Sequence, residues 1–172
     1  MSEIESIHDL NADLFRKEEV DRFASPVEAR KKAMDYLARR EYGQHELEQK
    51  LTKAGFEPTV AMDAVQKLAD EGLQDDTRFV ENFTQSRINQ GKGPVRIRQE
   101  LGERGLNSSL IDEVLENVAE DWFELARDVR CKKFGAAMPG EFKEKARQMR
   151  FLQYRGFESS HIQSATSSHG DD

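Results

Sequence analysis

Apolar residues recur along most of this chain three and four positions apart, which is the spacing of one face of an α-helix. The longest such stripe is formed by Leu110, Ile111, Val114, Leu115 and Val118. The sequence has no run of alternating apolar and polar positions rich in β-branched residues, so nothing in it indicates a β-strand. The pattern therefore predicts an all-α protein.

One short motif occurs three times: a leucine, then a glycine four positions later, then an apolar residue. The copies cover residues 51–56, 101–106 and 152–157, so they lie 50 and then 51 positions apart. Each copy fits a Schellman turn, in which a Gly at positive φ ends a helix and the next residue packs back onto its last turn. Because repetition at such a period indicates a repeated supersecondary unit, we expect three tandem helical units.

Helix start signals give the boundaries of these units. Residues 25–28 (SPVE) have the form of a capping box with Pro at the first helical position, and Asn107 is a predicted N-cap. We expect a partly disordered N-terminal extension (1–25), three three-helix repeats (26–75, 76–120 and 121–165) and a disordered tail (166–172). The repeats should form an elongated, curved array with hinges near 73–76 and 119–122.

The charge of the chain is unevenly distributed. Charged residues are 34% and hydrophobic residues 37% of the 172 residues, which favours several small cores over one large core. The net charge is −7, yet residues 122–155 carry nine Lys and Arg against four Asp and Glu. A basic third repeat beside two acidic ones is the polarity expected of a protein that lies along a charged partner.

The composition also bears on the compartment. The N-terminal residues are acidic and no apolar stretch is long enough for a signal peptide or a membrane span, so we expect a cytoplasmic protein without membrane contact. Cys131 is the only cysteine, which excludes a disulfide framework and fits a reducing compartment. We expect Cys131 to be an ordinary helix residue.

Catalytic and metal-binding motifs are absent from the sequence: HExxH, Walker A, GxSxG and CxxC do not occur. Gly91 and Gly93 precede Pro94 without a predicted strand before them, so we interpret them as a helix break and not as a phosphate loop. The histidines lie far apart and are expected at the surface: His8, His45, His161 and His169. We therefore predict a protein that is not an enzyme, with no cofactor, no metal and no small-molecule substrate.

The basic residues are the candidate binding residues. Lys143, Arg147 and Arg150 are spaced i, i+4 and i+7 on one face of a predicted helix. The opposite face of that helix should bury apolar residues: Phe142, Ala146, Met149 and Leu152. The other candidates are Arg155, Lys132 and Lys133 in the third repeat and Arg96, Arg98 and Arg104 in the second. They could serve helix solubility and dipole compensation, or they could contact an anionic partner; the sequence leaves both interpretations open.

Three segments of the chain resemble one bacterial family. They are residues 36–56 (YLARREYGQHELEQKLTKAGF), residues 68–79 with 91–101 (LADEGLQDDTRF and GKGPVRIRQEL), and residues 145–157 (KARQMRFLQYRGF). These segments resemble the opening, middle and closing modules of RecX, the regulator of the recombinase RecA. The resemblance spans roughly residues 27–165 and recurs in all three repeats.

The resemblance implies a regulator that binds the groove of the RecA filament on single-stranded DNA. RecX proteins restrain RecA's ATP hydrolysis, its strand exchange and its stimulation of SOS repressor self-cleavage. We expect a monomer that also makes weak, salt-sensitive contact with DNA. The alternative is a direct DNA-binding protein, because three-helix units with a Gly-containing turn are similar to helix-turn-helix modules. An enzyme is the third and least favoured class.

Overall fold

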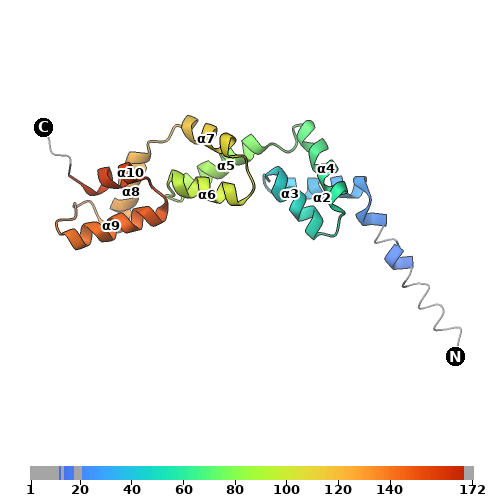
Figure 1. Cartoon of the computed structure of the whole chain (residues 1–172), viewed down its shortest axis with the longest axis horizontal. Helices are drawn as coiled ribbons and strands as arrows, with labels where there is room; N and C mark the ends of the chain where they lie inside the picture. Colours follow the sequence, from blue (N-terminus) through green and yellow to red (C-terminus); the bar gives the residue numbers. More distant parts are fainter. Residues whose placement is uncertain (1–11, 13, 18–20, 169–172) are drawn as a thin grey trace, which may run out of the picture. The chain divides into compact units, whose positions relative to one another are not determined.

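The structure, a computed structural model, describes residues 12, 14–17 and 21–168. The chain divides into two compact units, Met1–Asp76 and Thr77–Asp172, which are described separately. All regular secondary structure in the described residues is helical, so the all-α prediction is confirmed (Figure 1). The expected curvature of the array stays a prediction.

The first three-helix domain consists of α2 (Pro26–Leu37), α3 (Gln44–Lys53) and α4 (Pro58–Asp70). Its core joins the small residues of α2 to the leucines of α3 and the apolar stripe of α4, including Ala29, Ala33, Leu47, Leu51 and Leu68, all of them fully buried. The chain after α4 is fixed to this core, because the side chain of Gln74 donates to the carbonyl oxygen of Tyr42 at 3.1 Å.

The second domain contains α5 (Asp76–Asn89), α6 (Pro94–Glu103) and α7 (Ser108–Asn117). Phe79, Val80, Ile97, Leu101 and Ile111 form the centre of its core. The predicted N-cap is confirmed, since the side-chain oxygen of Asn107 accepts hydrogen bonds from the amides of Ser109 and Leu110 at 2.9 and 3.3 Å.

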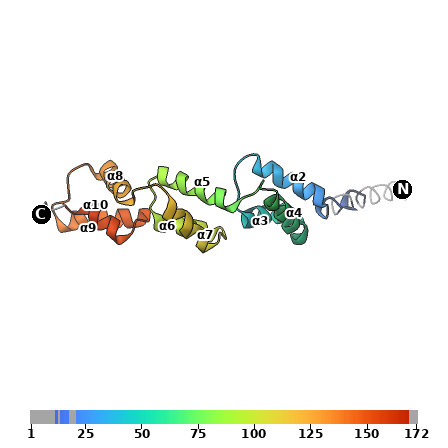
Figure 2. The same cartoon turned by 90° about the horizontal axis from the view of Figure 1, so that it is seen from above.

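The third domain contains α8 (Trp122–Phe134), α9 (Phe142–Arg155) and α10 (Ser159–Thr166), which pack against one another (Figure 2). Ala126, Leu152, Ile162 and Ala165 are central to its core. Leu125 packs against both this core and the core of the second domain. The two domains therefore share apolar contacts within one compact unit.

A buried arginine holds the loop that leads into α9. Arg130 is 1% exposed, and its guanidinium donates to the carbonyl oxygens of Ala137 at 3.1 Å and Ala136 at 3.3 Å. It also donates to the side chain of Gln148 at 3.3 Å. Because a buried cation needs hydrogen-bond partners, these contacts fix the path of the loop and the start of α9.

The three predicted Schellman turns are confirmed. The amides of Phe56, Leu106 and Phe157 donate to the carbonyl oxygens of residues 51, 101 and 152 at 3.2, 3.3 and 3.2 Å. The glycine of each turn has a positive φ: 110° at residue 55, 79° at residue 105 and 90° at residue 156. The repeated motif therefore marks the same helix ending in all three domains.

A backbone contact joins the second and third domains. The amide of Gly93 donates to the carbonyl oxygen of Arg155 at 2.9 Å, and the amide of Val95 donates to that of Gly156 at 3.0 Å. A methyl group on Gly93 would collide with the Gly156 carbonyl, and one on Gly156 would collide with the backbone of Arg96. Both glycines are thus needed for the approach of the two chain segments, and the chain is not divided at the expected hinge near 119–122.

Several residues differ from expectation. Phe142 is 89% exposed, because it is the first residue of α9 and the buried face of that helix is formed by Gln148 and Leu152. His161, expected at the surface, is buried. Its ring nitrogen accepts a hydrogen bond from the Glu158 amide and completes a capping box for α10. The Ser25 amide donates to Arg22 and not to Glu28, so only one half of the first capping box forms, with Ser25 Oγ accepting from Glu28 at 3.4 Å.

The two predicted disordered ends lie only partly within the described residues. Phe23 belongs to the expected extension, yet its ring contacts the Phe56 ring edge-on with centroids 5.5 Å apart. Thr166 belongs to the expected tail, yet it is buried as the last residue of α10. Residues 1–11, 13, 18–20 and 169–172, which include His8 and His169, lie outside the described part of the chain.

Candidate functional site

The first candidate surface is the basic face of α9, formed by Lys143, Arg147 and Arg150. All three side chains are exposed, and the helical spacing places them on one side of the helix. Arg147 is paired with Glu144 at 3.1 Å and lies over the Phe134 ring at 5.1 Å. Lys143 and Arg150 make no ion pair with any other described residue. Two of the three charges are thus free for a partner.

An aromatic residue extends this face. Tyr154 is 72% exposed and follows Arg150 by four positions, so it continues the same row along α9. Phe142, 89% exposed, stands at the other end of the helix. Large exposed aromatic side chains beside cations are typical of surfaces that bind a partner. Tyr154 was not among the residues predicted from the sequence, although the i+4 periodicity from Arg150 could have identified it.

The second candidate site is a cavity of about 350 Å³ between the second and third domains, called here the junction cavity. Lys132, Lys133 and Arg155, three residues predicted from sequence to bind a partner, meet at this cavity. Its other walls come from the end of α5 and from the apolar sides of α8 and α9: Ile88, Asn89, Gln90, Gly91, Leu125, Asp128, Val129 and Phe151. Asp128 is the one carboxylate among the lining residues.

Arg155 is oriented by two contacts. Its Nη1 donates to the backbone oxygen of Gln90 at 3.0 Å, and its guanidinium lies 5.3 Å from the centre of the Phe151 ring. Both contacts fix the side chain without neutralising its charge. The cation therefore stays available to an anion that enters the junction cavity.

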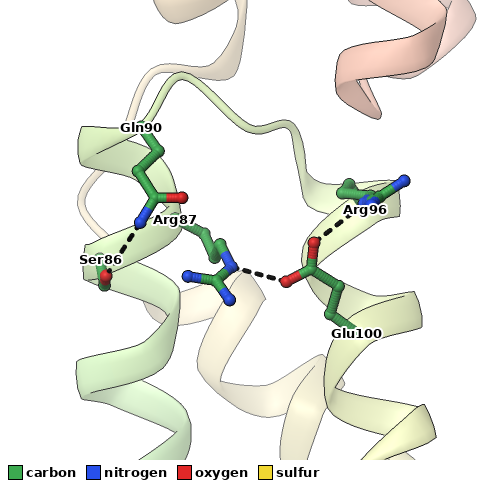
Figure 3. A network of polar contacts seen from close by, with 5 residues as sticks. All are labelled: Ser86, Arg87, Gln90, Arg96 and Glu100. Atoms are coloured by element: carbon green, nitrogen blue, oxygen red, sulfur yellow. Dashed lines mark hydrogen bonds and ion pairs between the residues drawn. The ribbon is translucent and has the colours of Figure 1, made fainter.

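A small ion-pair network joins α5 and α6 (Figure 3). Glu100 accepts from Arg87 Nε at 2.6 Å and from Arg96 Nε at 2.9 Å, so one carboxylate joins α5 to its own helix α6 (Figure 3). Burial would raise the pKa of Glu100, but the hydrogen bonds and charges of the two arginines outweigh it and hold the pKa below its ordinary value. Glu100 is therefore ionised at neutral pH and forms ion pairs with both arginines.

Lys92, which follows the cavity residue Gly91, adds a further positive charge. Partial burial is the main reason that the pKa of Lys92 lies below its ordinary value, and repulsion from Arg155, Arg96 and Arg87 lowers it further. Glu100 opposes this effect and does not cancel it. Cations are thus in excess at this junction. Lys92 and Arg87 were not among the residues predicted from the sequence, because only the fold brings Lys92 close to Arg155.

The three arginines predicted on α6 do not act together. Arg96 pairs with Glu100, while Arg98 pairs with Asp112 at 2.9 Å. Arg104 lies over the Phe83 ring at 5.1 Å. Each of these arginines makes contacts inside the second domain, which fits the structural interpretation better than a shared binding surface.

No three His, Cys, Asp or Glu side chains of the described part of the chain gather closely enough to hold a metal ion. No helix of the described residues is long and apolar enough to cross a membrane. Cys131 is half-buried on α8, with its sulfur 3.3 Å from the guanidinium of Arg130.

The fold defines a tandem array of three-helix domains, and comparison with known proteins assigns the family. Models of the first, second and third three-helix domains of RecX match residues 29–68, 75–115 and 119–166. The chain belongs to the RecX family. The resemblance found in the sequence is thereby confirmed.

Related sequences and structures agree with this assignment. The chain is 44% identical to the regulatory protein RecX of Halorhodospira halophila over 149 residues, 87% of this chain and 92% of that protein. It is also 44% identical to the regulatory protein RecX of Pseudomonas fluorescens over 146 residues, 85% of this chain and 94% of that protein.

Among solved structures, a crystal structure of regulatory protein RecX matches with a TM-score of 0.70 and 26% identity, covering 81% of this chain and 70% of that one. The crystal structure of RecX from Lactobacillus salivarius matches with a TM-score of 0.69 over 85% of this chain and 95% of that one. At 18% identity the second match concerns the fold alone.

Proposed function

We propose that this protein is a regulator, chiefly a negative one, of the recombinase RecA. It binds the groove of the RecA filament on single-stranded DNA and restrains ATP hydrolysis, strand exchange and SOS coprotease activity. Membership of a family of regulatory proteins, over all three domains, is the observation that carries this proposal. The protein acts without a cofactor, as a non-enzymatic cytoplasmic partner of RecA.

The basic face of α9 is the part of the molecule that best suits the contact with the filament. Lys143, Arg147 and Arg150 are exposed, and a phosphate or carboxylate on the filament would meet them without first breaking a strong internal ion pair. Among the described residues, the one ion-pair partner of these three cations is Glu144, which lies on the same helix at 3.1 Å from Arg147. Such an exposed pair is worth little and is easily exchanged.

Co-sedimentation with RecA filaments tests this function. The protein should sediment with RecA assembled on single-stranded DNA in the presence of ATP, and bind less to RecA without DNA. Because charged contacts contribute, the bound fraction should fall as salt rises. Failure to sediment with assembled filaments even at low salt would refute the proposal.

Direct contact with DNA is the second candidate function. Lys132, Lys133, Lys143 and Arg150 have no ion pair with another described residue, so these charges suit phosphate contacts. These cations are divided between α8 and α9 and are not gathered on one recognition helix, so we expect weak binding without sequence preference. A sequence-specific footprint on duplex DNA would instead favour a helix-turn-helix protein that acts on DNA directly.

A further inference from the structure

We propose that the junction cavity binds one nucleotide unit, with its phosphate on Lys132, Lys133 and Arg155 and its base against the apolar wall. The nucleotide belongs to a single strand of nucleic acid or is free in solution. This inference rests on the DNA contact proposed above, and it requires no RecA.

Charge is the first argument. Lys132 and Lys133 are exposed at the end of α8, and neither makes an ion pair with another described residue. Arg155 reaches the same cavity from α9, and among the described residues its side chain has one hydrogen-bond partner, the backbone carbonyl of Gln90. The cavity is thus lined by three cations and by one carboxylate, that of Asp128. A bound phosphate would neutralise the excess positive charge.

Further cations near the junction cavity also favour the binding of an anion. Partial burial is the larger cause of the lowered pKa of Lys92, and repulsion from Arg155, Arg96 and Arg87 adds to it, so several cations lie close together here. Glu100 is already shared by Arg87 and Arg96. An added phosphate would relieve this repulsion, so binding is favoured before any specific hydrogen bond is counted.

Shape is the second argument. The cavity measures about 350 Å³, which is within the range of pockets that hold small organic groups. The apolar part of its lining is formed by Ile88, Leu125, Val129 and Phe151. A nucleotide has a charged phosphate and a planar base, and it would satisfy the cations and cover this apolar wall together.

The backbone of the junction supplies rigidity. The hydrogen bonds of Gly93 with Arg155 and of Val95 with Gly156 fix the two walls of the cavity relative to each other. The Gln90 carbonyl holds the guanidinium of Arg155 in place at 3.0 Å. A site whose side chains are already ordered loses less entropy when its ligand binds.

An acidic peptide is the competing ligand class. A Glu or Asp side chain would meet the cations but would leave the apolar wall exposed to water. The combination of cations with an apolar wall that includes an aromatic ring therefore favours a nucleotide over a carboxylate.

The test is fluorescence anisotropy of the full chain with a labelled oligothymidylate, without RecA, over a series of salt concentrations. The double variant K132Q/K133Q removes two exposed charges from the cavity, and K53Q/K67Q removes two exposed charges from the first domain as the matched control. Circular dichroism checks that both variants stay helical.

We expect K132Q/K133Q to weaken binding about tenfold at low salt and to reduce the slope of log K against log salt by about 1.4, which is two single-strand phosphate contacts. K53Q/K67Q should leave that slope unchanged. Thymidine monophosphate as competitor separates the two sources of the nucleotide: displacement assigns the cavity to free nucleotides as well, and no displacement assigns it to strands alone.

Two results would overturn the proposal. The first is an equal slope for the parent chain and K132Q/K133Q, or an equal loss in K53Q/K67Q, since the contact would then lie elsewhere or be unspecific. The second is stronger displacement of the probe by polyglutamate than by unlabelled oligothymidylate, which would assign the cavity to an acidic protein segment. Neither result would affect co-sedimentation with RecA filaments through the basic face of α9, so the two proposals can fail separately.

Discussion

Gly105 has a backbone φ of +79°, a conformation that a β-branched side chain strongly disfavours. It ends α6 with the two hydrogen bonds of a Schellman turn, from its own amide to Gly102 at 3.0 Å and from Leu106 to Leu101 at 3.3 Å. Single residues of this kind determine where a helix stops and how the next one begins.

Replacing Gly105 with Val should therefore lower the free energy of unfolding by about 1–2 kcal/mol or more. Gly102→Ala is the control, because Gly102 lies inside α6 and a methyl group there would meet nothing within 4 Å. The control should gain roughly 0.5–1 kcal/mol, since Ala favours the helix over Gly. Urea unfolding curves measure both, and a Gly105→Val curve identical to that of the parent would disprove the role of this turn.

Glu100 is the second residue whose chemistry can be tested. Its pKa lies below the ordinary value of 4.5, so the folded state binds its proton less readily than the unfolded chain does. The stabilisation is therefore complete above that ordinary value and is lost as pH falls from it through the folded-state pKa. At neutral pH the contribution should be roughly 1 kcal/mol, because both arginine partners are partly exposed.

The variant Glu100→Gln should be less stable than the parent at neutral pH, and the two should converge as pH falls from the ordinary value of 4.5 through the lower folded-state pKa, where the parent carboxylate is protonated. The control is Glu103→Gln, three residues further along α6, where the carboxylate accepts a hydrogen bond from Gln99 at 3.0 Å. It should destabilise the protein less than Glu100→Gln does at neutral pH. Thermal melts at several pH values give the comparison. A stability gap for Glu100→Gln that stayed constant down to strongly acidic pH would rule out this ion-pair network as its cause.

At the scale of helices, the contact between Gly93 and Gly156 determines how the second and third domains meet. Neither position can accept a side chain without moving the opposite backbone. Two backbone hydrogen bonds, 2.9 and 3.0 Å long, depend on that approach. The loop before α6 and the turn after α9 are therefore one structural element, although they are about sixty residues apart in sequence.

Gly93→Ala should weaken this junction and lower the melting temperature of the second and third domains, with a loss of about 1–3 kcal/mol. Gly156→Ala should do the same. Because both changes disrupt the same contact, the double variant should lose clearly less than the sum of the two. Strictly additive losses in a double-mutant cycle would show that the two glycines act independently.

Sequence patterns predicted the helices better than their contacts. Asn107 and the three turn glycines were identifiable because capping and Schellman chemistry are local. Phe142 was misplaced because the buried side of α9 is determined by α8 and α10, which place Gln148 and Leu152 inside. The junction cavity could not be predicted, since Lys132 and Arg155 are brought to Gly91 only by packing between domains.

At the scale of the whole molecule, positive charge is concentrated in the third domain and at its junction with the second. The first domain contributes exposed charges of both signs, several of them paired, such as Arg30 with Glu71 at 2.7 Å and Arg40 with Glu46 at 2.7 Å. In the third domain Lys143 and Arg150 have no such partners among the described residues. This asymmetry is the reason for proposing that α9 contacts RecA filaments.

The most direct test is inhibition of RecA's ATP hydrolysis on single-stranded DNA by the triple variant K143E/R147E/R150E. The three side chains are exposed on α9, so the fold should stay intact, and each lost contact should be worth roughly 1 kcal/mol at moderate salt. The control K31E/K53E/K67E makes the same change of charge at exposed positions of the first domain.

We expect the parent chain and the control to inhibit RecA and the α9 variant to lose most of its inhibition, with the difference shrinking as salt rises. A folded α9 variant that inhibits RecA as strongly as the parent chain would contradict the assignment of the basic face of α9. No inhibition by the parent chain itself would contradict the proposed function.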